Sequence, residues 1–511
     1  MREIACILRK LQPKWRMTPK GQGEYFMARI IVSTYSGLPN ATKLPCFYEG
    51  LIDALVREGN DVLLILTNGL IIDIWENNIT SPDIDKTRLD RAIVDFAPEL
   101  VITFNNSMYE NIPRLVDCPI AIWTSDSPSM LADKENLKRH IKRYHLISPT
   151  DTEDFIQGYK DYFGASDSQI SVVYFASDFK AETIPQDKNI SFIGTHFSHS
   201  RSLERILKQH VRGAEAIRRD FKLFLDAYKK NVWKSPATVS RELGFKHRFF
   251  IDFSHAEILN IISGNQRVQT LAAVSDLGLH LYGSEKWRDV SEFSVDLALA
   301  YDPVHVSSVK ENQDIYNSSK IALNITHAQA GKAFSWRVRD IMACNAALVS
   351  DYREDIVTHF GKYVKIPMYD NPYDARALCQ KVLGDAVWRR EIVQGSQLAI
   401  EEGHRFRHRL KDCEQILGVN LFPGAKGSLV WLDLKDFRKS ILENFVRGGL
   451  SRQQTAFLFK DYLGTFCIRL IPLTLIPYAV NLAKSWGIKG SPAILRNLRD
   501  KLGLDKPARD A

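Results

Sequence analysis

The segment RIIVS at residues 29–33 begins the pattern that decides the fold. It is a short apolar run rich in β-branched residues, which is typical of a buried strand. Residues 47–58 have apolar side chains at helical spacing, Gly59-Asn60 ends that segment, and VLLIL at residues 62–66 is again strand-like. A strand, a helix and a strand at this spacing predict a βαβ unit and hence a parallel sheet.

The same alternation continues in two series, which predict an α/β protein with two Rossmann-like lobes. The N-terminal lobe, residues 27–180, has further strand-like runs at 100–104, 120–124, 145–148 and 172–174. A polar linker at 177–189 follows. The C-terminal lobe, residues 190–420, has a helical insertion at about 213–274 and strand-like runs at 190–194, 279–282, 322–325, 347–350 and 363–366. Residues 1–26 form a basic leader, and residues 421–511 form a basic helical tail with an apolar stretch.

Composition excludes several classes of protein. A chain of 511 residues with 45% hydrophobic and 25% charged residues is globular and long enough for two domains. Seven cysteines are widely spaced without a C-x-x-C pair, which favours reduced thiols in the cytosol and no zinc site. The apolar run at residues 4–8 is too short for a secretory signal. Both Met1 and Met27 remain open as the true start.

Several motifs of nucleotide and hydrolase chemistry are missing. The sequence has no G-x-G-x-x-G, no P-loop and no G-x-S-x-G, which disfavours dehydrogenases, kinases and α/β-hydrolases. No D-x-D stands at the end of a predicted strand to hold a metal with a sugar nucleotide. We therefore expect no metal and no cofactor. In that case helix N-termini and cationic side chains would neutralise a leaving diphosphate.

The segment NSSKIALNITHAQAGKAFSWRVRDIMACNAALVSDYREDIVTHFG, residues 317–361, resembles the C-terminal domain of the CgeB-like group of GT-B glycosyltransferases. That family has an LN strand end, then an R-x-x-E helix start, a small-residue turn and a closing F..G. Leu323-Asn324, Arg337 and Phe360-Gly361 match this pattern, whereas Asp340 replaces the glutamate and Asn345 the glycine. The family's other elements resemble residues 190–195 with Arg201, residues 281–283 with Trp287, and residues 120–128.

This resemblance implies transfer of a sugar from a nucleotide donor, held by the C-terminal lobe, to a glycan or lipid-linked acceptor on the N-terminal lobe in cell-surface polysaccharide synthesis. The candidate donor-binding residues are Thr195, His196, Arg201, Gly283, Asn324, His327, Arg337 and Asp340. Asp126 is the candidate general base for the acceptor hydroxyl.

Each candidate also has a structural interpretation. Arg337 could cap a helix or form an ion pair within its lobe, Asp340 could stabilise the helix dipole, and His327 could be an ordinary loop residue. Asp126 could form an Asx turn or an N-cap before Ser127-Pro128. We expect Arg339 to form a surface ion pair.

The tail accounts for the net charge of the chain. After residue 420 there are 15 Lys and Arg against 7 Asp and Glu, which equals the +8 of the whole chain. The apolar stretch 463–483 contains Arg469, Pro472 and Pro477, so a membrane span, an interfacial anchor and a helix packed on the first lobe all remain open. The basic residues that follow it would attract anionic lipid, namely Lys484, Lys489, Arg496, Arg499 and Lys501.

We therefore predict a cytoplasmic enzyme that is peripheral on the inner face of the membrane. Basic residues without interleaved aromatic side chains argue against nucleic acid as a partner. Two other functions remain open. One is a nucleotide-sugar epimerase of similar shape, which would not need the tail. The other is a GT-B-like binding or scaffold protein without catalysis, which Asp340 in place of glutamate would suit.

Overall fold

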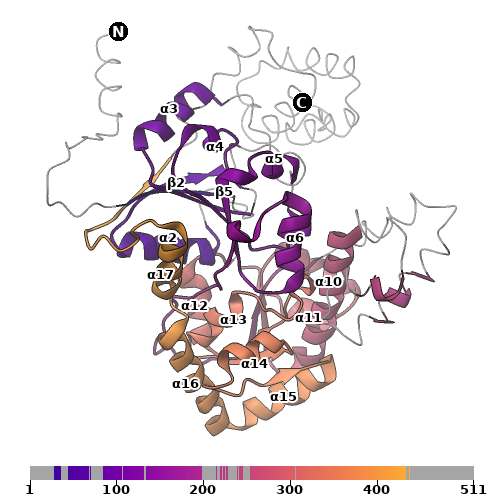
Figure 1. Cartoon of the computed structure of the whole chain (residues 1–511). Helices are drawn as coiled ribbons and strands as arrows, with labels where there is room; N and C mark the ends of the chain where they lie inside the picture. Colours follow the sequence, from indigo (N-terminus) through magenta and orange to yellow (C-terminus); the bar gives the residue numbers. More distant parts are fainter. Residues whose placement is uncertain are drawn as a thin grey trace, which may run out of the picture.

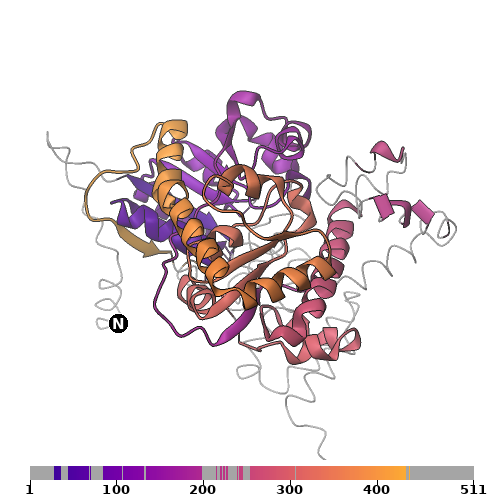
Figure 2. The same cartoon turned by 90° about the horizontal axis from the view of Figure 1, so that it is seen from below.

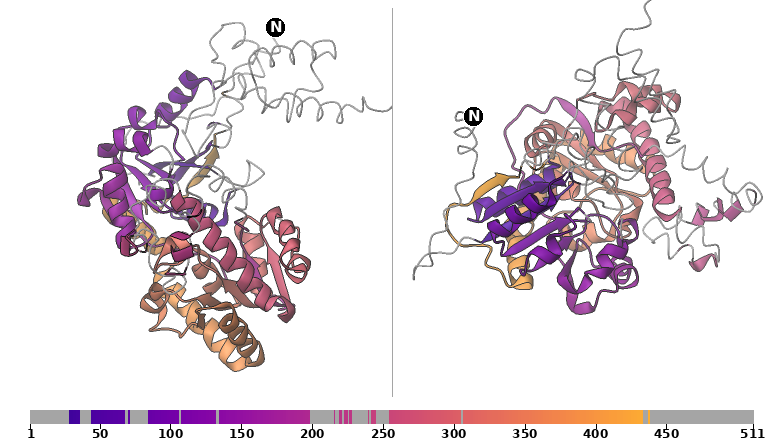
Figure 3. Two further views of the ribbon diagram at one scale, coloured as in Figure 1. Left: turned by 90° about the vertical axis from the view of Figure 1, so that its right-hand side faces the viewer. Right: turned by 90° about the horizontal axis from the view of Figure 1, so that it is seen from above.

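The computed structural model describes residues 28–35, 44–67, 84–131 without 106, 134–197 and 254–432 without 305, together with isolated residues elsewhere. The leader at 1–26, Arg201 and the tail beyond residue 432 (Phe437 apart) lie outside the described residues. Figure 1 shows two lobes, with the N-terminal lobe in indigo to magenta and the C-terminal lobe in pink to orange. Figure 3 shows the same two lobes from the side and from above.

The N-terminal lobe is built on a parallel sheet of seven strands. Their order is β12-β2-β1-β3-β4-β5-β6. The bounds are β1 Arg29–Thr34, β2 Asp61–Leu66, β3 Leu100–Phe104, β4 Ile120–Trp123, β5 Tyr144–Ser148, β6 Ile170–Val172 and β12 Ser428–Trp431. The central strands β1, β3 and β4 are mostly apolar and are buried except for Arg29, because helices cover both faces of the sheet. One face carries α2 (Cys46–Arg57), and the other carries α3 (Lys86–Phe96), α4 (Ile112–Leu115), α5 (Lys134–Arg139) and α6 (Glu153–Phe163).

The C-terminal lobe has a parallel sheet of five strands in the order β11-β10-β9-β7-β8. The bounds are β7 Lys188–Ile193, β8 Leu279–Tyr282, β9 Ser319–Asn324, β10 Ala347–Asp351 and β11 Met368–Tyr369. The main helices of this lobe are α10 Ser254–Val274, α11 Val295–Leu299, α12 Val309–Asn317, α13 Arg337–Met342, α14 Glu354–Phe360, α15 Pro372–Gly384 and α16 Ala386–Gly403. Two parallel α/β lobes confirm the predicted fold class. The closing strand, predicted at 363–366, is instead β11.

The chain returns to the N-terminal lobe after α16. Helix α17 (Phe406–Leu417), which the sequence analysis assigned to the C-terminal lobe, packs on α2. Residues 428–431, which were assigned to the tail, form β12 and pair with β2. Figure 2 shows α17 and β12, in orange and tan, beside the indigo elements of the N-terminal lobe. The described part of the segment after residue 420 therefore includes an edge strand of the first sheet.

Aromatic packing joins the lobes on the side of this return. Trp336, just before α13, stacks on Phe47 of α2 with ring centroids 5.4 Å apart. Trp336 also meets Phe175 edge to face at 5.6 Å. Such contacts bury apolar surface from both lobes and stabilise one relative placement. No helix among the described residues is long and apolar enough to cross a bilayer.

Candidate active site between the lobes

The carboxyl ends of the two sheets meet at Asp126 and Gln329. Asp126 follows β4 in the N-terminal lobe, and Gln329 lies in the short 3-10 helix Ala328–Ala330 that follows β9. The Gln329 side-chain amide donates to Asp126 Oδ1 at 2.9 Å, and its oxygen accepts from the Ser127 backbone N–H at 3.0 Å. Ligands of open α/β sheets bind beyond these strand ends. The candidate site is therefore the region between the two lobes.

Asp126 is held by side-chain amides. Asn105, which follows β3 with a φ of 50°, donates to Asp126 Oδ2 at 2.8 Å. The side-chain oxygen of Asn105 accepts from the backbone N–H groups of Ser125 at 2.7 Å and Asp126 at 3.2 Å. Ser127, not Asp126, precedes the next short helix, and no side chain caps that helix. The carboxylate thus faces Asn105 and Gln329, each of which donates to one of its oxygens.

Two loops at the strand ends of the C-terminal lobe lie unusually close together. Gly283 has a φ of +142°, and a Cβ there would lie 1.8 Å from the carbonyl oxygen of Gly194. Trp287 Nε1 donates to the same oxygen at 2.8 Å. Thr195 Oγ1 donates to Ser284 Oγ at 2.9 Å. Only glycine fits at position 283, because it has neither a Cβ nor a penalty for positive φ.

Both candidate histidines lie beside these strand ends. His196 is buried, with its ring 5.0 Å from that of Trp287. His327 Nδ1 accepts from the backbone N–H of Gln329 at 3.3 Å, so Nε2 carries the proton and donates to Asn260 Oδ1 at 2.9 Å. His327 thereby caps the short helix that carries Gln329.

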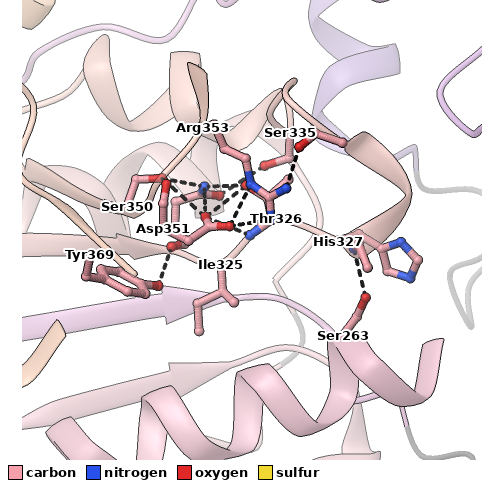
Figure 4. Close-up of polar contacts among 12 residues, drawn as sticks. Ser263, Ile325, Thr326, His327, Ser335, Ser350, Asp351, Arg353 and Tyr369 are labelled. Carbon is pink, nitrogen blue, oxygen red and sulfur yellow. Dashed lines mark hydrogen bonds and ion pairs between the residues drawn. The ribbon is translucent and has the colours of Figure 1, made fainter. Parts of the chain in front are cut away.

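Asn324 belongs to a buried polar network at the end of β9. Figure 4 shows Thr326, Ser350, Asp351 and Arg353 of this network. Its side-chain amide donates to Thr326 Oγ1 at 3.0 Å, Ser350 Oγ at 2.9 Å and Asp351 Oδ1 at 3.2 Å. Asp351 also forms a buried ion pair with Arg353, with Nη2 and Oδ2 2.6 Å apart. The side-chain oxygen of Asn324, Oδ1, faces the site and accepts from Arg337 Nη1 at 3.3 Å. The network fixes the direction in which Asn324 presents this oxygen.

Arg337 is half-buried at the start of α13. Besides the bond to Asn324, its guanidinium lies over the ring of Phe192 at 5.3 Å. It forms no ion pair with a carboxylate among the described residues. The structure therefore does not support an ion pair within the lobe as the role of this cation.

Arg267 of α10 is a second cation beside the strand ends of the C-terminal lobe, and it is not among the candidates predicted from the sequence. It is buried and donates to the carbonyl oxygens of Thr195 at 2.7 Å and Ile325 at 3.3 Å. Its Nε has no hydrogen-bond partner among the described residues. Burial and the nearby charge of Arg337 lower the pKa of Arg267 well below its usual value. A buried cation without a paired carboxylate is costly, so the pair Arg267 and Arg337 favours an anion.

Asp340 and Arg339 lie deeper than their positions in the sequence suggested. Burial raises the pKa of Asp340 to about 7, although a hydrogen bond from Ser177 and the charges of Arg337 and Arg339 oppose this shift. The prediction of a surface ion pair for Arg339 is wrong. Arg339 is 1% exposed, its guanidinium stacks on Phe334 at 4.6 Å, and Nε lies 3.4 Å from His404 Nδ1. All of α13 after Arg337 is buried.

No group of three or more His, Cys, Asp or Glu side chains is arranged to hold a metal ion within the described ranges. The described cysteines are Cys46, Cys118, Cys344, Cys379 and Cys413, and all of them are free thiols.

Residues 266–415 match the family model described as glycosyl transferase-like. This range, most of which lies within the C-terminal lobe and which contains Arg267, Asn324, Gln329 and Arg337, is similar to that family. No match was found among curated proteins.

Solved structures of glycosyltransferases are similar to this chain at low sequence identity. Sucrose-phosphate synthase from Thermosynechococcus elongatus is 12% identical with a TM-score of 0.44, and the match covers 76% of this chain and 98% of that one. HepE from Anabaena, solved with UDP and glucose, is 10% identical with a TM-score of 0.44, covering 77% and 100%. WaaG, a glycosyltransferase of lipopolysaccharide biosynthesis, is 10% identical with a TM-score of 0.40, covering 77% and 100%. At these values the similarities carry no conclusion about the ligands of this chain.

Proposed function

We propose that this protein transfers a sugar from a nucleotide-sugar donor to a hydroxyl of a glycan or lipid-linked acceptor, in the assembly of a cell-surface polysaccharide. The observation that carries the proposal is the pair Arg267 and Arg337. These cations lie at the carboxyl ends of β7 and β9, within the range 266–415 that matches the family model. Neither is paired with a carboxylate among the described residues. A nucleoside diphosphate supplies the missing negative charge.

The proposed reaction uses side chains from both lobes. The acceptor oxygen attacks the anomeric carbon of the donor while the bond from that carbon to the diphosphate oxygen breaks. The electron pair of that bond leaves on the diphosphate, where Arg267 and Arg337 stabilise the developing charge. The acceptor proton passes to the carboxylate of Asp126, which comes from the N-terminal lobe.

The remaining candidates support this arrangement. The loops at Thr195, His196, Gly283 and His327 shape the donor site, and Asn324 orients Arg337 through a 3.3 Å hydrogen bond. Asp340 is buried beside Arg337 and contributes to the same local charge balance. The cations make a metal unnecessary for neutralising the leaving group. Docking of the 421–511 tail on an anionic inner membrane surface would bring the site to a lipid-linked acceptor.

The experiment that tests this function measures release of nucleoside diphosphate from UDP-, GDP-, dTDP- and CMP-sugars, or of CMP in the last case. We compare the parent protein with Asp126→Asn, which keeps the shape of the side chain but removes its ability to accept a proton. We expect turnover to fall by about 10²–10⁴-fold while donor affinity is preserved. Normal turnover by Asp126→Asn would return this residue to a structural role. If the parent turned over none of these donors, the proposed function would be contradicted.

A further inference from the structure

Gln329 connects the two lobes at the residue proposed as the base. One side chain of the C-terminal lobe makes two hydrogen bonds to consecutive residues of the N-terminal lobe, at 2.9 Å to Asp126 Oδ1 and 3.0 Å from the Ser127 N–H. The three residues come from opposite strand ends, 203 positions apart for the pair Asp126 and Gln329. Nothing in the family pattern of residues 317–361 marks Gln329.

We infer that Gln329 is a positioning residue that couples closure of the lobes to the orientation of the Asp126 carboxylate. In naming Asp126 as the base, this inference rests on the proposed function. The hydrogen bonds themselves do not depend on it. Gln329 contacts the Asp126 carboxylate and acts through it.

The C-terminal side of this connection is rigid. Gln329 sits in a short helix whose first N–H, that of Ala328, donates to Ser263 Oγ of α10 at 2.9 Å. His327 caps the same helix and is held by Asn260, also of α10. Figure 4 shows Ser263 beside the loop that carries His327. The Gln329 amide is therefore fixed relative to α10, the helix that also carries Arg267.

On the N-terminal side, the two oxygens of the Asp126 carboxylate accept hydrogen bonds from different lobes. Asn105 of the same lobe donates to Oδ2, so separation of the lobes would leave this bond in place, whereas Gln329 of the other lobe donates to Oδ1 and would lose its bond. Closure thus adds one donor to the carboxylate and restricts it to one orientation.

Two other contacts between the lobes end on residues other than Asp126. Lys332 pairs with Asp151 at 3.0 Å, and the backbone N–H of Val309 in α12 donates to Glu49 Oε2 of α2 at 2.8 Å. These contacts contribute to the placement of the lobes without contacting the carboxylate. A contact that only stabilised the placement of the lobes could be made by any pair of residues. The contact of Gln329 is made with the candidate base.

The test has one part that does not depend on any substrate. A ketone-bearing amino acid is incorporated at Gln157 of α6 and Tyr373 of α15, both exposed, and spin-labelled without using the native cysteines. Double electron–electron resonance then measures the distance between the lobes in the full chain. Gln329→Ala should add a longer distance to the distribution. Gln397→Ala is the matched control, because that half-buried amide bonds only within the C-terminal lobe, to the Cys344 carbonyl oxygen and Asn345 Oδ1. Identical distributions for Gln329→Ala and the parent would overturn the coupling to closure.

The second part uses the sugar nucleotide that the parent turns over fastest. Loss of one hydrogen bond to a charged group should lower kcat about tenfold in Gln329→Ala. KM for the donor should change little. Gln329→Glu keeps the length of the side chain but removes the N–H donor and places a second carboxylate beside Asp126, so its kcat should fall at least as far.

The two proposals fail in different ways. If the parent and Gln329→Ala have the same kcat while Asp126→Asn is inactive, the positioning role is wrong and the function stands. If the parent turns over no sugar nucleotide, the proposed function fails, the assignment of a base falls with it, and the distance measurement alone decides whether Gln329 couples the lobes.

Discussion

Replacing Arg337 by alanine should weaken donor binding far more than it affects folding. In the absence of a ligand, the guanidinium makes one hydrogen bond, 3.3 Å to Asn324 Oδ1, and lies over the Phe192 ring at 5.3 Å. Because Arg337 is half-buried and unpaired with a carboxylate among the described residues, the loss should cost only about 1 kcal/mol of folding stability. In the complex the same group would make charge-assisted bonds to a diphosphate.

The expected loss follows from that difference. Hydrogen bonds to charged groups contribute about 1.5–3 kcal/mol, so the dissociation constant of the nucleotide sugar should rise about 10- to 150-fold. Isothermal titration calorimetry of parent and variant with the same donor measures this directly. Affinity for the free nucleoside, which has no phosphate, should not change.

A control arginine separates the site from a general loss of charge. Arg376 of α15 lies in the same lobe and is paired with Asp276 on the exposed surface, with Nη2 and Oδ2 2.8 Å apart. Arg376→Ala should bind the donor as the parent does. Equal donor affinity for Arg337→Ala and the parent would refute the assignment of this cation to the diphosphate.

Three further predictions concern metal, membrane and pH. Turnover should survive excess EDTA; complete loss that manganese or magnesium restores would reveal an acidic metal site. Reversal of charge at Lys484, Lys489, Arg496 and Arg499 should release the protein from anionic liposomes, because each basic residue near the surface contributes about 1 kcal/mol, and unchanged co-sedimentation would indicate a structural tail. Burial raises the pKa of Asp340 from 3.8 to about 7, so the folded state binds more protons than the unfolded state between these values and stability falls as pH rises through that range. Asp340→Asn should flatten this part of the stability profile in urea unfolding, and an unaltered slope would contradict the raised pKa.

Local patterns in the sequence predict both lobes because buried parallel strands have near-continuous apolar runs. RIIVS and VLLIL form β1 and β2 in parallel register, with Ile30 opposite Val62. Strand β12 has no such signal. It lies at the edge of the sheet, and three of its four residues are exposed, so only its pairing with β2 defines it. In the C-terminal lobe the edge strand β11 lies at 368–369 and not at 363–366; it has only two residues and is defined by its pairing with β10.

The site depends on contacts that local patterns do not encode. Polar residues after strand ends mark Asp126, Thr195 and Asn324, and the structure places all three at the carboxyl ends of the sheets. No local pattern marks Arg267, because one arginine in a mixed helix resembles a solvated residue until the fold places it against the carbonyl oxygens of Thr195 and Ile325. Arg339 was placed at the surface because its burial comes from elements distant in sequence, such as His404.

The most direct test of the central claim is a thermal unfolding screen of the full-length protein against UDP-, GDP-, dTDP- and CMP-sugars. We expect the sugars of one nucleotide to stabilise the folded state, by about 2.7 kcal/mol when the ligand is present at 100 times its dissociation constant. Arg337→Ala should lose most of this stabilisation. If none of the four nucleotide classes stabilises the parent at any concentration up to the millimolar range, the donor site and the proposed glycosyl transfer are both contradicted.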